Sequence, residues 1–147
     1  MKLLSESDSD YIRKKYIACF VDAGSDYYIN RIHKLTRFND GMCYTGYLWD
    51  CFKKKFIMSE RQCLENMKFH ESFWVFWDIH SRERILISDY WKYPKTAVIQ
   101  IDYQEFINIR DTFPEDIYVV DKTFLWSVAF THEVDEKQKR FCYYVYR

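Results

Sequence analysis

Apolar residues in the first part of the chain recur at the spacing of an α-helix. Ile12, Tyr16 and Phe20 lie four residues apart, which places them on one side of a helix. This spacing predicts a helix over residues 11–21. A weaker pattern of the same kind predicts a second helix over residues 26–36.

Two further helices are expected before residue 70. Five apolar residues recur at helical spacing after a glycine-containing break: Tyr44, Leu48, Cys51, Phe52 and Phe56. Ser59 and Gln62 then have the spacing of a capping box, in which two side chains bond to free backbone N–H groups at a helix N-terminus. The capping box predicts a helix over residues 60–69.

The period of the pattern changes to two residues at Ser72, which is typical of β-strands. From there, apolar side chains alternate with their neighbours at Phe73, Val75, Trp77 and Ile79. Residues 85–90 alternate in the same way and are the expected hairpin partner of this strand. Residues 97–101 form a third, short predicted strand.

One more helix separates these strands from the remaining ones. Asp102 is a suitable N-cap with Glu105 three residues later, so a helix is predicted over residues 103–111, before Pro114. Three further segments have the pattern of strands, and we expect them to pair antiparallel. They are residues 117–120, 124–131 and 141–146.

Helices in the first half of a chain and strands in the second are typical of an α+β fold. We therefore expect a single domain over residues 1–147, with a helical half over residues 9–70 and a sheet half over residues 72–147. The N-terminal helices are expected to cover one face of a five- or six-stranded, mostly antiparallel sheet, with one helix between the strands.

Composition narrows the class of protein. The chain has 147 residues, of which 48% are hydrophobic, so it can bury one core and is neither disordered nor fibrous. Its five cysteines are an odd number without CxxC spacing, and we expect buried free thiols in a reducing cytosol. The acidic first ten residues do not resemble a secretion signal, and no apolar run is long enough to span a membrane. A cytoplasmic protein without a membrane partner is expected.

The formal net charge of zero hides an uneven distribution of charge. Residues 1–70 carry 12 basic and 9 acidic side chains, whereas residues 71–147 carry 10 basic and 13 acidic ones. The acidic excess is concentrated in residues 111–136, where Lys122 is the only basic residue. The balanced total argues against a nucleic-acid partner, and the acidic segment favours a basic protein partner.

Acidic side chains beside exposed aromatic ones would attract such a partner and accelerate its association. The 13 tyrosines and 5 tryptophans include more than a core requires, and both residue types are common anchors at protein interfaces. The expected partner-binding residues are Asp116, Tyr118, Asp121, Glu133, Asp135, Glu136 and Trp91. The alternative interpretation is that the acidic residues only form a solvated surface.

The sequence lacks the motifs of common catalytic and cofactor sites. Its three glycines do not form a phosphate-binding loop, and its four histidines do not have the spacing of a zinc site. Cys51 precedes a run of lysines that would activate a thiol, but its apolar neighbours favour core packing. We therefore expect no catalytic residue, metal or cofactor.

One short stretch resembles a known group of proteins. It runs from Asp116 through Ile-Tyr-Val-Val to Asp121, continues to Trp126 and closes with Thr-His-Glu at residues 131–133. The pattern resembles a strand pair in small bacterial proteins, among them immunity proteins of contact-dependent and other polymorphic toxin systems. The resemblance implies a cytoplasmic α+β inhibitor that binds a toxin domain, often a nuclease, and has no catalytic activity of its own.

The leading hypothesis is therefore an immunity protein that blocks a cognate, basic toxin domain. The first alternative is a small hydrolase or nuclease, in which folding joins His132 and Glu133 to His80 or Cys142. The second alternative is a single-strand RNA-binding domain, because basic residues are interleaved with the aromatic strands. Its basic residues would be Arg82, Arg84, Lys92 and Lys95.

Overall fold

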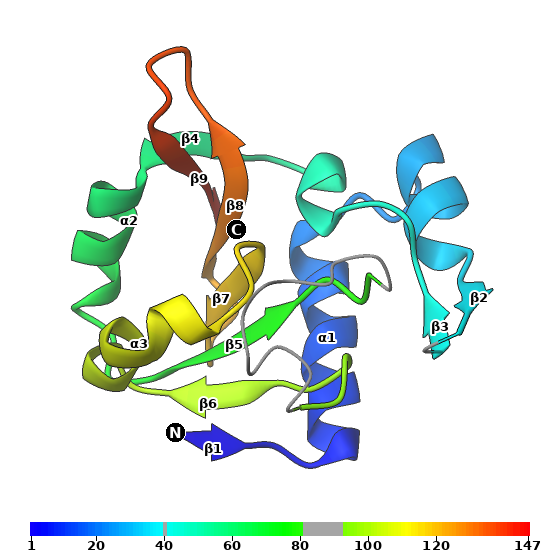
Figure 1. Ribbon diagram of the computed structural model, residues 1–147, viewed down its shortest axis with the longest axis horizontal. Helices are drawn as coiled ribbons and strands as arrows, with labels where there is room; N and C mark the ends of the chain where they lie inside the picture. The colour runs from blue at the N-terminus through cyan, green and yellow to red at the C-terminus, as the bar shows by residue number, and fades with distance from the viewer. Residues whose placement is uncertain (40, 81–92) are drawn as a thin grey trace.

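A computed structural model describes residues 1–39, 41–80 and 93–147 of the chain (Figure 1). Trp91 and the predicted strand over residues 85–90 lie outside the described residues. The first half contains β1 (Lys2–Leu3), α1 (Glu6–Phe20), the π-helix η1 (Tyr28–His33), β2 (Thr36–Phe38), β3 (Gly41–Cys43), the 3-10 helix η2 (Leu48–Cys51), β4 (Phe56–Ser59) and α2 (Glu60–Met67). The second half contains β5 (Phe73–Trp77), β6 (Ile99–Ile101), α3 (Tyr103–Ile109), the 3-10 helix η3 (Arg110–Thr112), β7 (Ile117–Asp121), β8 (Trp126–Val134) and β9 (Arg140–Tyr146).

Seven strands form the main sheet in the order β1-β6-β5-β7-β8-β9-β4, and each neighbouring pair is antiparallel. The predicted α+β fold is confirmed, and the described sheet has seven strands where five or six were expected. The additional strands are β1 and β4, which come from the first half of the chain and form the two edges. β2 and β3 form a separate two-stranded hairpin.

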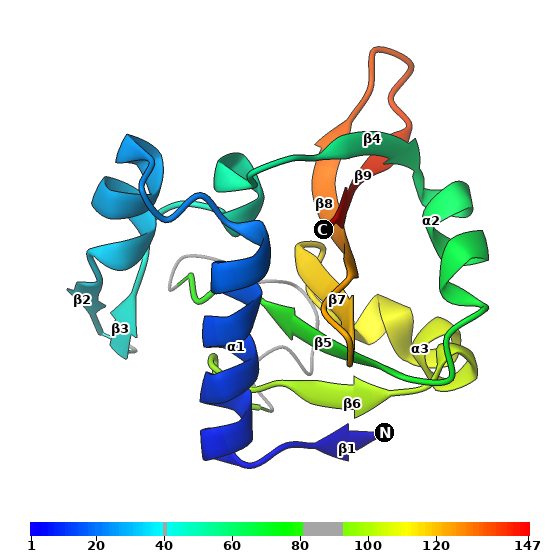
Figure 2. The same ribbon diagram turned by 180° about the vertical axis from the view of Figure 1, so that it is seen from behind.

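Helices cover both faces of this sheet, whereas the sequence predicted helices on one face. Successive side chains of a strand point to opposite faces, and in β7 Tyr118 and Val120 join one core while Ile117 and Val119 join the other. α1 packs on the first face and lies behind the sheet in Figure 1 and in front of it in Figure 2. α2 and α3 pack on the second face. The sequence pattern did not reveal two covered faces because one buried face was enough to explain the alternation.

The core between α1 and the sheet, here called the α1-face core, contains a buried carboxylate. Asp78 follows β5 and is 1% exposed. Its carboxylate accepts hydrogen bonds from the hydroxyls of Tyr118 and Tyr44, at 2.6 and 2.8 Å, and from the backbone N–H of Leu48 at 3.3 Å. The Tyr118 hydroxyl also accepts a hydrogen bond from the backbone N–H of Trp49 at 3.3 Å. These bonds attach η2 to the sheet.

The core between the sheet and the helices α2 and α3, here called the α2/α3-face core, is mainly apolar. Phe106 of α3 is fully buried and meets the ring of Phe73 edge-on, with 5.5 Å between the ring centroids. Cys63 of α2 and Cys142 of β9 are hydrogen-bonded, and this bond together with burial raises the pKa of the Cys142 thiol. The prediction of buried free thiols is confirmed for four of the five cysteines, and Cys19 is partly exposed.

Capping sequences predicted the start of two helices correctly. Both hydrogen bonds of the capping box between Ser59 and Gln62 are present, and α2 begins at the residue after the serine. The side chain of Asp102 accepts a hydrogen bond from the backbone N–H of Glu105 at 2.9 Å, and α3 begins directly after it. These signals are reliable because they depend only on residues close in the sequence.

The other helix predictions need correction. α1 begins at Glu6 instead of residue 11, because Ser5 accepts a hydrogen bond from the backbone N–H of Asp8 and caps the helix there. The second predicted helix is the short π-helix η1. The third is replaced by η2 and by β4, in which Phe56 pairs with Tyr144 of β9. Pairing with a distant strand therefore overrides the helical spacing of this segment.

Candidate functional site

Three of the predicted partner-binding residues are buried. Asp116, Tyr118 and Asp121 are 4%, 0% and 7% exposed. Asp116 accepts a hydrogen bond from the backbone N–H of His132 at 2.8 Å, and Asp121, at the other end of β7, accepts one from the hydroxyl of Thr123. The expectation that these side chains face a partner therefore does not hold in this structure, because they bond within the fold instead.

The other predicted acidic residues lie in the β8–β9 hairpin. Glu133 is partly buried and accepts a hydrogen bond from the hydroxyl of Tyr143 at 2.6 Å. Asp135 is exposed but accepts two backbone N–H bonds that shape the turn, and Glu136 is exposed beside it. Three basic residues share this hairpin: Lys137, Lys139 and Arg140. The hairpin is therefore balanced in charge and does not form the acidic rim that the sequence predicted.

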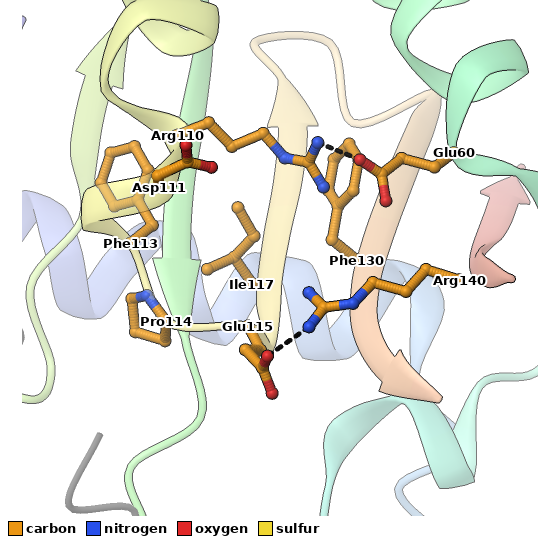
Figure 3. Close-up of a pocket in the computed structure, with 9 residues that line it drawn as sticks. All are labelled: Glu60, Arg110, Asp111, Phe113, Pro114, Glu115, Ile117, Phe130 and Arg140. Carbon is orange, nitrogen blue, oxygen red and sulfur yellow. Dashed lines mark hydrogen bonds and ion pairs between the residues drawn. The ribbon is translucent and has the colours of Figure 1, made fainter. Parts of the chain in front are cut away.

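A pocket of about 320 Å³ opens where η3, the start of α2 and the start of β9 meet (Figure 3). Two ion pairs cross it in opposite directions: Arg110 of η3 reaches Glu60 of α2, and Arg140 of β9 reaches Glu115. Asp111 also lines the pocket. The apolar lining of the pocket consists of Phe113, Pro114, Ile117 and Phe130. The pocket thus joins an apolar surface to five charged groups.

Local structure explains how these charged groups are placed. Glu60 is the first residue of α2, where a carboxylate is favoured by the positive end of the helix dipole. The guanidinium of Arg110 lies 4.6 Å from the ring centroid of Phe130, which is a cation–π contact. Phe113 is buried and stacks on Phe106 at 6.0 Å, and this contact fixes the turn that carries the pocket residues.

The pocket has one carboxylate more than it has guanidinium groups. Asp111 is exposed, and its carboxylate has no hydrogen bond or ion pair with any residue in the described ranges. The side chains of Glu115 and Arg140 are 46% and 48% exposed, so their ion pair contributes only about 0–1 kcal/mol and is easily exchanged. A cationic side chain from outside can therefore pair with Asp111, and another can replace Arg140 at Glu115.

A second group of polar side chains gathers beside η2. Nδ1 of His132 lies 2.9 and 3.0 Å from the two carboxylate oxygens of Asp116. The ring of Tyr47 lies next to both histidines, with centroid distances of 5.4 Å to His132 and 4.7 Å to His80. Burial lowers the pKa of His80, and its Nε2 lies 2.6 Å from the carbonyl oxygen of Gly46. Folding therefore brings two of the predicted catalytic candidates together.

The other candidates for catalysis lie elsewhere. Glu133 bonds to a tyrosine hydroxyl, and Cys142 is buried in the α2/α3-face core. Cys51 donates a hydrogen bond to the carbonyl of Leu48 at 3.3 Å, and burial raises the pKa of its thiol to about 12. This is the opposite of an activated thiol, so the prediction that Cys51 packs in the core is confirmed.

Comparisons of the chain with protein-family models, curated proteins and solved structures find no match. In the ranges that the structure describes, no helix is both long and apolar enough to cross a membrane. In those same ranges, no group of three or more His, Cys, Asp and Glu side chains is arranged to hold a metal ion. Function must therefore be inferred from the pocket and from the histidine pair.

No pattern in the sequence singles out Glu60, Arg110 or Arg140. Glu60 and Arg110 are 50 residues apart and meet only because α2 and η3 lie against the same face of the sheet. The acidic bias of residues 111–136 was a partial signal, since Asp111 and Glu115 belong to it and line the pocket.

Proposed function

We propose that the chain is an immunity protein that binds a basic bacterial toxin domain, commonly a nuclease, and blocks it. The observation that carries this proposal is the unpaired carboxylate of Asp111 beside the exchangeable ion pair of Glu115 and Arg140. Lysine or arginine side chains of the toxin enter the pocket and pair with these carboxylates. The resemblance of residues 116–133 to immunity proteins supports the same class.

Charge explains how such binding neutralises a nuclease. A nuclease holds the phosphates of its substrate with lysine and arginine side chains, so its substrate-binding surface is basic. Carboxylates that pair with those side chains exclude the substrate. The same charges accelerate the encounter of the two proteins, and this effect decreases as salt is added.

Co-expression tests this function. A candidate toxin domain from a neighbouring gene is produced in cells with and without the chain, and growth is expected only in the presence of the chain. Killing of cells that contain the chain in excess over the toxin contradicts the proposal.

Charge reversal in the pocket tests the surface. Asp111→Lys is expected to slow association with a catalytically inactive toxin about tenfold at low ionic strength and to weaken its dependence on salt. Asp26→Lys is the matched control, since Asp26 is exposed and belongs to the segment before η1. Association rates are measured by stopped-flow fluorescence. Equal association rates for both variants exclude the pocket as the binding surface. A slower association with Glu136→Lys alone assigns binding to the β8–β9 hairpin.

A hydrolase or nuclease is the second candidate, favoured by the pairing of His132 with Asp116. A carboxylate at Nδ1 fixes the imidazole ring and directs proton transfer to Nε2, as a general base requires. Hydrolysis of RNA and DNA by the purified chain is the test, and His132→Gln is expected to abolish it. Activity that persists in this variant rejects the role of His132.

A further inference from the structure

The outer side of β4 is an unpaired edge of the main sheet. In the described sheet, β4 pairs with β9 on one side and ends the strand order on the other. Alternate residues of an antiparallel edge strand direct their backbone N–H and C=O groups outward. The N–H of Ser59 bonds to the side chain of Gln62, so Ser59 is an outward position and Ile57, two residues earlier, is the next one. The edge therefore presents the backbone of Ile57 for pairing.

Exposed apolar side chains surround this edge. Ile57 is 69% exposed, which is high for an isoleucine in a strand. The rings of Phe56 and Tyr146 stack with 5.2 Å between centroids, and both side chains are more than a third exposed. Figure 2 shows β4 next to β9, with which it pairs along residues 141–144. An added strand at this edge would cover apolar surface on both faces of the sheet.

Three lysines precede β4 and are not neutralised by carboxylates. Lys53 and Lys55 donate hydrogen bonds to backbone carbonyls at 2.7 and 2.9 Å. Lys54 lies over the rings of Phe56 and Tyr146, with 5.2 and 4.9 Å between its Nζ and the ring centroids. None of these ammonium groups is paired with a carboxylate in the part of the chain that the structure describes. The segment that leads into β4 therefore carries three positive charges without a carboxylate partner among the described residues.

We propose that the outer edge of β4, together with Lys53, Lys54 and Lys55, binds an extended segment of another protein in which an apolar stretch adjoins acidic residues. Backbone pairing at Ile57 supplies the binding mode, because an added strand bonds to the edge through its own main chain. The lysines supply charge complementarity to the acidic residues. This surface shares no residue with the pocket, and the inference does not depend on the proposed function.

The same observations disfavour two other occupants. A second copy of the chain presents the same lysine-rich segment instead of an acidic one, and lysines beside an edge oppose pairing between copies. A nucleic acid fits the lysines, but it does not form the strand pairing that Ile57 offers. Its bases also need free aromatic faces, whereas Phe56 and Tyr146 already stack on each other.

Two synthetic peptides test the proposal with the whole chain. Both alternate valine and threonine, and one ends in three aspartates while the other ends in three lysines. We expect the aspartate peptide to bind about tenfold more tightly, as three weak ion pairs would produce. NMR titration of the labelled chain is expected to shift the backbone amides of residues 55–59. Equal binding of the two peptides, or shifts confined to other segments, overturns the proposal.

Charge-reversal variants complete the test. Lys54→Glu is expected to remove the preference for the aspartate peptide, whereas Lys137→Glu, on the exposed β8–β9 hairpin, leaves it unchanged. Oligouridine is titrated in parallel, and the mass of the free chain is measured by light scattering over a range of concentrations. Oligouridine binding at β4 without peptide binding, or a dimer that Lys54→Glu disrupts, assigns the edge to another occupant and rejects the proposal.

Discussion

The two faces of the main sheet are packed with different chemistry. The α1-face core contains the buried carboxylate of Asp78, which accepts hydrogen bonds from the buried hydroxyls of Tyr44 and Tyr118. The α2/α3-face core contains mainly phenylalanine, valine and isoleucine side chains, with the thiols of Cys63 and Cys142. Hydrogen bonds are directional and packing is not, so the two faces are expected to respond differently to mutation and to pH.

The buried hydrogen bonds of the polar face also hold a short helix against the sheet. α1 lies on the polar face, and α2 and α3 lie on the apolar face with the 3-10 helix η3. The π-helix η1 and the 3-10 helix η2 lie on the polar face, where Leu48 and Trp49 of η2 donate backbone N–H bonds to Asp78 and Tyr118. Side-chain acceptors in the core therefore satisfy the first two N–H groups of η2, which have no partner within a helix. Breaking either kind of interaction tests this comparison.

A cavity in the apolar face should lower the free energy of unfolding more than the other changes proposed below. Phe106→Ala is expected to lower the free energy of unfolding by about 3–5 kcal/mol, because the side chain is fully buried among other rings. Ile107→Ala on the same helix is the control, since Ile107 is 37% exposed and should cost much less. Urea unfolding measures both, and the loss should be the same at pH 5 and pH 8. A loss below 1 kcal/mol contradicts tight packing on this face.

The second effect belongs to the polar face and depends on pH. Burial raises the pKa of Asp78 from 3.8 to about 7, while its hydrogen bonds lower it. The folded state therefore binds the proton of the Asp78 carboxyl group more tightly than the unfolded state does. Protonation of Asp78 contributes fully to the free energy of unfolding below pH 4, and this contribution is lost as the pH rises through 7.

Asp78→Asn removes this proton and should flatten the pH dependence. The wild-type free energy of unfolding is expected to fall between pH 4 and pH 8, by a few kcal/mol from Asp78 alone. The variant should lack this part of the slope, whereas Asp26→Asn, at an exposed position, should retain it. Urea unfolding at a series of pH values measures the slopes. Parallel curves for wild type and Asp78→Asn would show that Asp78 is ionised in both states.

The distance along the sequence between interacting residues explains how much of the fold could be predicted. The capping sequences at Ser59 and Asp102 lie beside the helices that they start, and the strands β7, β8 and β9 have continuous apolar patterns, so both were found. Residues 26–56 were misassigned because their partners lie far away in the sequence, such as Asp78 for the N–H of Leu48. For the same reason, none of the predicted partner-binding residues that the structure describes is among those that line the pocket. The acidic segment indicated Asp111, but the position of Glu60 depends on the packing of α2.

The smallest effect compares one hydroxyl on each face. Tyr118→Phe removes the donor to Asp78 and the acceptor of the Trp49 N–H, both buried, and should cost about 1–3 kcal/mol. Tyr144→Phe should change stability by less than about 0.5 kcal/mol, because this partly buried hydroxyl bonds to no residue in the described ranges. Urea unfolding at pH 5 measures both variants against wild type. Equal losses would mean that hydroxyl groups stabilise the two faces alike and would remove the distinction between them.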